Sequence, residues 1–118
     1  MVTIMLLFLL QLKHFVVDFL WQPEYEWRNK GTWGHPGGIN HSVKHALATF
    51  LILIFFKTHL VALNIAIFEG FAHYLIDYSK MNINSNMGWK ADKNPEFWYL
   101  LGLDQFLHQI CYCIIVVI

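Results

Sequence analysis

The hydrophobic positions of the chain fall into four long stretches that are separated by polar segments. These stretches cover about Val2–Leu20, His41–Phe56, Leu60–Tyr78 and Phe97–Ile118. Each is close to the ~20 apolar residues that an α-helix needs to cross the hydrocarbon core of a bilayer. A chain of 118 residues suits one domain. The pattern therefore predicts an all-α integral membrane protein, in which residues 1–118 form a single antiparallel, up-and-down four-helix bundle.

The segments between the stretches differ in length. Residues 57–59 (KTH) predict a tight hairpin, whereas residues 21–40 and 79–96 predict longer polar loops because they are rich in Gly, Pro and Asn. The tripeptide Asn94-Pro95-Glu96 predicts the start of the last helix, with Asn as the N-cap and Pro in the first turn. Four crossings then place both long loops on one side of the membrane, and the hairpin and both termini on the other.

Basic and aromatic residues are concentrated on the side of the long loops. The basic residues there are Arg28, Lys30, Lys44, Lys80, Lys90 and Lys93, against Lys57 alone on the other side. The positive-inside rule predicts cytoplasmic long loops and outside termini, in the inner (cytoplasmic) membrane. All five tryptophans also lie at or near this side, as in an interfacial aromatic belt. Lys13, inside the first stretch, has no evident partner in the sequence.

The composition agrees with a membrane protein and excludes several functions. Hydrophobic residues make up 57% of the chain and charged residues only 14%, whereas soluble domains contain about 25% charged residues. The net charge is zero, so no nucleic-acid partner is expected. Neither GxxxxGK[ST] nor GxGxxG occurs, which leaves nucleotide binding without support. The two cysteines, Cys111 and Cys113, lie in an apolar run and are interpreted as small apolar residues.

Each apolar stretch carries polar residues at a spacing of about four, which places them on one face of a helix. They are His14, Asp18 and Gln22; His41 and His45; Glu69, His73 and Asp77; and Asp104, Gln105 and His108. Because alternate helices run in opposite directions, all of these residues are expected in the cytoplasmic half of the membrane. The predicted arrangement has His14, His45, His73 and His108 in a deeper layer, Asp18, His41, Asp77 and Asp104 in a shallower layer, and Glu69 beneath His73.

Such residues predict a metal site. Ionisable groups are costly inside a membrane and are usually functional or paired. Imidazole nitrogens and carboxylate oxygens together bind zinc, manganese or iron, and facing bundle helices are known to supply them. We therefore predict a divalent metal, zinc first and manganese or iron next, with ligands His14, Asp18, His41, His45, His73, Asp77, Asp104 and His108. The alternatives are a metal-free hydrogen-bonded network and a path for protons or ions.

Four motifs in this pattern resemble those of a known family. HFVVDFLWQ (14–22), HSVKHAL (41–47), HYLIDYSK (73–80) and DQFLHQ (104–109) are similar, in order, to motifs of the DUF3307 family of small bacterial and phage membrane proteins. The resemblance spans nearly the whole chain, and it implies the membrane architecture and a residue set but no reaction. The residues it carries over are His14, Asp18, Gln22, His45, His73, Asp77, Lys80, Asp104, Gln105 and His108.

Three functional hypotheses follow. In the first, a bound metal activates water, Glu69 or Asp104 acts as the catalytic carboxylate, and a lipid or lipid-linked substrate is cleaved near Lys44 and Lys80 at the cytoplasmic leaflet. In the second, the chain is a component of a metal, ion or proton transporter, for which so small a bundle would have to form a homo-oligomer. In the third, the polar residues only specify the packing of a non-catalytic membrane protein.

Overall fold

The computed structural model describes residues 1–118, and it is helical throughout, without strands. Four long helices dominate the fold, and α1 continues directly into a π-helical turn, η1. The elements are α1 (Val2–Phe15), η1 (Val16–Leu20), α2 (Glu24–Trp27), α3 (Pro36–Leu53), α4 (His59–Met87) and α5 (Pro95–Val117). The prediction of an all-α fold is confirmed.

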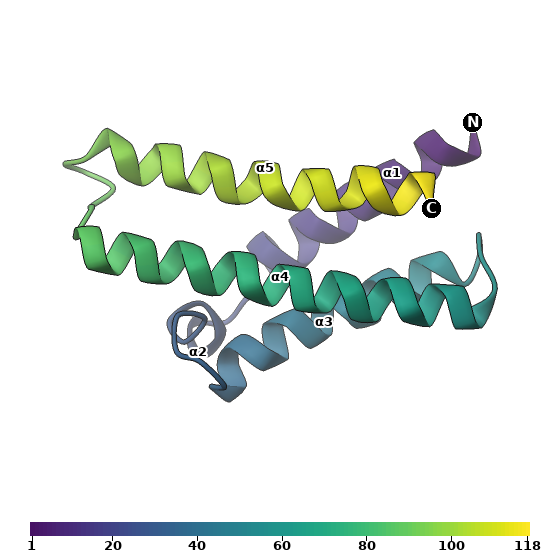
Figure 1. The fold of residues 1–118 in the computed structure, drawn as a ribbon, viewed down its shortest axis with the longest axis horizontal. Coiled ribbons are helices and arrows are strands. Elements are labelled where there is room, and N and C mark those ends of the chain that lie inside the picture. The colour runs from purple at the N-terminus through teal and green to yellow at the C-terminus, as the bar shows by residue number, and fades with distance from the viewer.

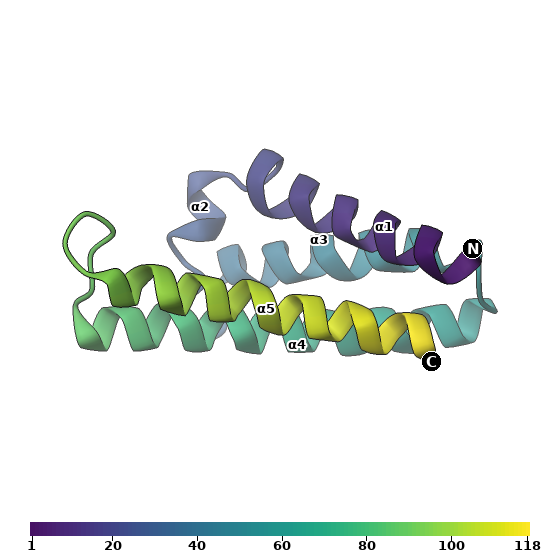
Figure 2. The same ribbon diagram turned by 90° about the horizontal axis from the view of Figure 1, so that it is seen from above.

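The long helices enclose a common interior. Helix α1 contacts α3 and α5, and α4 contacts α3 and α5 as well. Both termini and the turn between α3 and α4 lie at one end of the molecule, whereas α2 and the connection between α4 and α5 lie at the other (Figure 1). Seen from above, α1 and α3 lie on one side of the molecule, and α4 and α5 lie on the other (Figure 2). Polar side chains on the inner faces of all four helices are thereby brought together.

Burial is distributed as expected for a protein in lipid. Of the 25 buried residues, fourteen are polar or charged, while many large apolar side chains are exposed. Only one small apolar core occurs, formed by Leu6, Leu10, Leu53, Ala62, Ile65, Tyr112 and Ile115. A soluble protein would bury most of its large apolar side chains and expose its charged ones. Here the apolar surface faces outward, where a bilayer can cover it.

Three helical segments are long and apolar enough to cross a membrane. They are Val2–Leu20, His59–Met87 and Pro95–Val117. The predicted second span, His41–Phe56, is not among them. Its helix, α3, begins earlier, at Pro36, and ends at Leu53. Buried polar residues such as His41, His45 and Thr49 lower the apolar content of this helix, so its polar face depends on the neighbouring helices for cover.

The expected loop at 79–96 is mostly helix, which corrects the prediction. Helix α4 continues to Met87 and ends at Gly88, whose φ of 67° is the left-handed conformation that favours glycine. The side chains of Asn82 and Asn84, which the sequence favours as loop residues, have hydrogen-bond partners here. The Asn82 amide donates to the Gly31 carbonyl at 2.9 Å, so tertiary contact overrides the weak helix propensity of Asn. The expected start of the last helix is confirmed, with Asn94 as N-cap and Pro95 in the first turn.

The π-helical turn was not predicted, and it carries Asp18. The Trp21 amide donates to the Val16 carbonyl five residues back, at 2.8 Å, which widens the helix there. Such turns are rare and frequently occur at functional sites. In this chain the wider turn begins at Val16, two residues after His14, and ends at Leu20, two residues before Gln22. Hydrophobic periodicity does not report such a local change, because the same residues remain on the inner face.

A test of the packing between α2 and α3 is available at Gly37. A Cβ atom added there would collide with the Tyr25 carbonyl oxygen and lie 3.1 Å from the Asn29 Cβ. We expect Gly37→Ala to lower the free energy of unfolding by about 1–3 kcal/mol, because a backbone atom must move. Gly102→Ala is the control, since nothing lies within 4 Å of its added Cβ, and helix propensity favours it by about 0.5–1 kcal/mol. Chemical denaturation of both variants in detergent compares them, and equal stabilities would contradict this packing.

Candidate metal centre

Imidazoles from all four long helices meet in the interior. The ring centroid of His73 lies 3.6 Å from that of His45 and 4.1 Å from that of His108, so that the three rings are stacked. His41 lies 5.0 Å from His73, and His14 lies 5.2 Å from His108. All five histidines are buried. The structure therefore brings together imidazoles that are far apart in the sequence, in the positions expected from their spacing.

Asp18 lies among these rings and differs from the other buried carboxylates. Its Oδ1 is 2.7 Å from His45 Nε2, 3.0 Å from His41 Nε2 and 3.7 Å from His73 Nε2, and its Oδ2 is 3.1 Å from His14 Nε2. The other four buried carboxylates each have a lysine partner: Lys13 with Glu69, Lys30 with Asp77, Lys44 with Glu26 and Lys80 with Asp104. Asp18 is paired with imidazoles alone.

The atoms around Asp18 have the spacing of metal ligands. One atom each from Asp18, His41, His45 and His73 can be chosen so that all lie within 4.8 Å of one another. A tetrahedral ion with ligand bonds of 2.0–2.1 Å holds neighbouring ligand atoms roughly 3.4 Å apart. His73 Nε2 and His41 Nε2 are 3.1 Å apart, and the distances to Asp18 Oδ1 bracket the expected value. These four residues could therefore hold a metal ion.

Carboxylates also lie behind the rings of His41, His45 and His73, on their Nδ1 side. His41 Nδ1 is 3.5 Å from Glu26 Oε1, and Glu69 Oε1 is 3.9 Å from both His45 Nδ1 and His73 Nδ1. Metal-binding histidines usually donate their second N–H to such a carboxylate, which fixes the ring and strengthens the ligand. Glu69 thus faces away from the ligand atoms. Its position suits an orienting group better than the catalytic one predicted from the sequence.

Lys13 has the partner that the sequence did not reveal. Its ammonium donates to Glu69 Oε1 at 2.9 Å and lies 3.1 Å from His45 Nδ1. Because an ammonium has no acceptor, this contact leaves the ring proton of His45 on Nε2, which donates to Asp18. A metal at His45 Nε2 requires the proton on Nδ1 instead, and Glu69 is then its acceptor within reach.

A second group of ligand atoms adjoins the first. His73, Asp77 and His108 also offer atoms within 4.8 Å of one another. Asp77 Oδ1 lies 3.4 Å from His108 Nε2, and Asp104 Oδ1 lies 3.5 Å from the same nitrogen. Asp77 Oδ2 and Asp104 Oδ1 are buried without a hydrogen-bond partner. Lys30 Nζ lies 3.2 Å from Asp77 Oδ2, so that oxygen already has a cation. Buried polar atoms are normally paired, so Asp104 Oδ1 is the oxygen that is free to accept a proton or a cation.

The two glutamines and Lys80 surround this cluster. Gln105 accepts from His14 Nε2 at 2.8 Å and donates to Asp104 Oδ2 at 3.0 Å, which links the two groups. Gln22 donates to the backbone carbonyl of Asp18 and so holds the end of the π-helical turn. Tyr112 also belongs to the site, although it is not among the residues predicted from the sequence. Its hydroxyl lies 2.7 Å from His14 Nδ1, and its position four residues after His108 was the available signal.

Two openings reach the cluster. The loop-side pocket, of about 320 Å³, is lined by Gln22, Trp27, Lys30, Lys80, Met81, Asn84, Phe97, Leu100 and Leu101. The lateral groove, of about 210 Å³, lies between α4 and α5, and its lining includes Lys80, Asp104 and leucines that are exposed on the outer surface. Lys80 lines both openings. The lateral groove therefore reaches Asp104 from the side that would face lipid, and the loop-side pocket lies beside the lysines that pair with Asp77 and Asp104.

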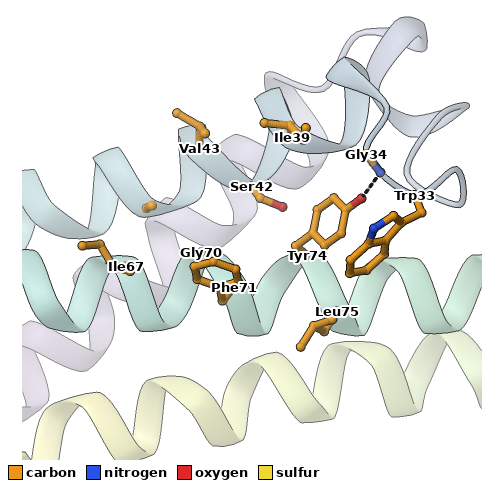
Figure 3. A pocket seen from close by; sticks show the side chains of 11 residues that line it. Trp33, Gly34, Ile39, Ser42, Val43, Ile67, Gly70, Phe71, Tyr74 and Leu75 are labelled. Carbon is orange, nitrogen blue, oxygen red and sulfur yellow. Dashed lines mark hydrogen bonds between the residues drawn. The ribbon is translucent and has the colours of Figure 1, made fainter.

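A larger apolar groove lies outside the cluster, between α3 and α4 (Figure 3). It has a volume of about 430 Å³ and includes Ile39, Val43, Ile67, Phe71 and Leu75. Tyr74 lies at one end and accepts a hydrogen bond from the Gly34 amide at 2.8 Å. The groove holds none of the candidate ligands, so it contributes apolar surface rather than chemistry.

The comparisons with known proteins bear on the whole of this region. A family model described as "Protein of unknown function (DUF3307)" matches residues 6–118, nearly the entire chain. Neither a curated protein nor a solved structure matches this chain. The matched range contains every residue of both ligand groups, their carboxylate partners and the four lysines.

Proposed function

The chain belongs to the DUF3307 family, whose function is unknown, and from its site we propose that it is a membrane-embedded, metal-dependent hydrolase. The four long helices form an up-and-down transmembrane bundle, with the site near the cytoplasmic end. A divalent ion, zinc first and manganese or iron next, is held by Asp18, His41, His45 and His73. The substrate is a lipid or lipid-linked molecule that carries an anionic group.

The environment of Asp18 is the observation that carries the proposal. A buried carboxylate without a cation is strongly unfavourable, yet Asp18 meets only imidazoles, and each of the three nearest to its Oδ1 has a carboxylate behind it. These carboxylates, Glu26 and Glu69, are also ion-paired with Lys44 and Lys13. Their position matches the arrangement in which a metal-bound imidazole is oriented from behind.

The charges of the cluster also suit a metal with a bound hydroxide. Five buried carboxylates face four lysines, which leaves one negative charge when the histidines are neutral. A divalent ion that carries one hydroxide supplies one positive charge and balances the site. Metal-bound hydroxide is also the nucleophile of metal-dependent hydrolysis.

The openings indicate the class of substrate. The loop-side pocket presents Lys30 and Lys80 among apolar walls, which suits an anionic group with an apolar attachment. The lateral groove leads from exposed leucines on α4 and α5 to Asp104, so a lipid can enter without leaving the bilayer. Asp104, with its unpaired Oδ1 at the inner end of this groove, is the carboxylate placed to take a proton from the attacking water.

The transporter hypothesis receives less support. Next to the polar cluster, the interior toward the termini is filled by the apolar core around Leu10, Leu53 and Ile115. These side chains are fully buried. They interrupt any continuous row of polar groups along the interior of a single chain. A path for ions would require such groups, or water, along its length.

Elemental analysis of the detergent-purified protein tests the metal site. We expect at least one zinc, manganese or iron ion per chain after dialysis, and far less in Asp18→Asn, which has the same shape but no charge. His59→Ala is the control and should keep its metal, because His59 is exposed at the start of α4. A wild-type protein that binds no divalent ion, even when zinc is added, would leave a hydrogen-bonded network as the explanation.

A further inference from the structure

The two ligand groups adjoin each other and together offer more ligand atoms than a single ion needs. We propose that the centre holds two divalent ions side by side, bridged by the carboxylates of Asp18 and Asp77. This inference rests on the proposed function, because the first of the two ions is the one described above. It adds the second ion, its ligands and the chemical class of substrate that such a pair accepts.

Asp18 divides its two oxygens between two sets of imidazoles. Oδ1 faces Nε2 of His41 and His45, at 3.0 and 2.7 Å, whereas Oδ2 faces Nε2 of His14, at 3.1 Å. His14 belongs to α1 and lies next to α5, and the other two histidines belong to α3. A carboxylate can bridge two ions when each of its oxygens faces a separate set of nitrogen ligands. Asp18 has this arrangement.

Asp77 repeats the arrangement from α4. Its Oδ2 lies 3.2 Å from His73 Nε2 and 3.4 Å from His41 Nε2, which belong to the first ion. Its Oδ1 lies 3.4 Å from His108 Nε2 on α5. Both bridging carboxylates are buried, at 9% exposure for Asp18 and 2% for Asp77. Two bridges with the same division of their oxygens define two neighbouring positions.

The second position has its own nitrogen and oxygen ligands. His14 and His108 face it from α1 and α5, with ring centroids 5.2 Å apart. Gln105 Oε1, which lies 2.8 Å from His14 Nε2, adds a neutral oxygen. Asp104, the proposed proton acceptor, lies beside this position, with its Oδ1 3.5 Å from His108 Nε2. The ligands are thus nitrogen and oxygen throughout, which suits zinc, manganese or iron.

A pair of ions favours one class among the substrates considered. Two-metal centres with ions about 3.5–4 Å apart clamp the oxygens of a phosphate group during its displacement. Two divalent ions also add positive charge that a phosphate offsets, and Lys30 and Lys80 line the pocket through which it would enter. We therefore assign the substrate class to lipid-linked phosphate esters.

Metal titration of the full-length protein in detergent tests the pair. The probes are Zn²⁺, measured by elemental analysis, and Mn²⁺, measured by electron paramagnetic resonance. We expect two zinc ions per wild-type chain, and at saturation a manganese spectrum of two magnetically coupled ions. The variant His108→Gln should retain one ion with an uncoupled spectrum. His14→Gln should do the same, so that the test does not depend on one variant.

The possible outcomes separate the two proposals. One zinc per wild-type chain, unchanged in both variants and with an uncoupled manganese spectrum, would overturn the second ion and leave the first. Absence of any bound zinc would overturn both. Two ions in the wild type that remain two in both variants would place the second ion elsewhere and overturn this assignment. His59→Ala is the matched control and should keep two ions.

Discussion

Replacing His73 by Ala is expected to reduce hydrolysis of a lipid phosphate ester by about 10³-fold or more. His73 lies at the centre of the cluster, stacked between His45 and His108, and it belongs to both ligand groups. A correctly held ion stabilises a transition state by several kcal/mol, and each 1.36 kcal/mol corresponds to a factor of ten in rate. Without the His73 imidazole the protein loses its ion or holds it in the wrong place, and either change removes this stabilisation.

The measurement is phosphate release from a synthetic phospholipid phosphate in mixed micelles, with the purified protein and added zinc or manganese. Glu24→Gln is the control, because Glu24 is exposed and pairs only with Arg28 on the short helix α2. His73→Asn should behave like His73→Ala, which guards against a packing defect. Wild-type activity in both His73 variants would show that hydrolysis does not depend on this centre. Absence of activity in the wild type, with metal bound, would direct attention to an ester or amide substrate.

Much of this arrangement can be read from the sequence, for a definite physical reason. The polar residues recur at helical spacing within apolar stretches, and a bilayer leaves them nowhere favourable to lie except the interior. His14, His45, His73 and His108 were therefore expected to meet, and their rings do lie together. The start of α5 at Asn94 and Pro95 can be predicted equally well, because these residues determine the start of a helix locally.

Other features depend on contacts that spacing does not show. The partner of Lys13 is Glu69, 56 positions away, and only the packing of α1 against its neighbours makes that choice. Lys30 and Glu26 lie in the segment predicted as a polar loop, yet both are buried against the site through Asp77 and His41. The π-helical turn at Asp18 changes the width of one turn without changing the hydrophobic pattern. The two carboxylate oxygens of Asp77 face different histidines, and this division is likewise a property of the folded site alone.

The buried pair of Lys13 and Glu69 carries the second large effect. Lys13→Met is expected to lower the free energy of unfolding by about 3–5 kcal/mol, because it leaves Glu69 as a buried charge without its cation. The two side chains are only 3% and 2% exposed, and their ion-pair distance is 2.9 Å. Without Lys13, the Thr49 hydroxyl at 3.2 Å is the hydrogen bond that Glu69 retains.

Three further variants make this prediction specific. Arg28→Met removes an ion pair of similar length whose side chains are 64% and 62% exposed, and it should cost no more than about 1 kcal/mol. Lys13→Met combined with Glu69→Leu should recover most of the lost stability, because an apolar pair replaces the buried charges. Glu69→Gln alone should also destabilise the protein, because it leaves the buried Lys13 ammonium without its carboxylate, although the Gln side-chain oxygen can still accept a hydrogen bond from it.

The double variant also separates stability from metal binding. Glu69 is the carboxylate behind His45 and His73, and loss of such an orienting group typically weakens metal affinity by about 10–100-fold. We therefore expect Lys13→Met/Glu69→Leu to unfold like the wild type in a denaturant titration from mixed micelles, while zinc binds 10–100-fold more weakly. Restored stability with unchanged zinc affinity would show that Glu69 only neutralises Lys13. Equal stabilities of Lys13→Met and Arg28→Met would show instead that the buried pair is not fixed in the interior, because only a charge held away from water is costly to isolate.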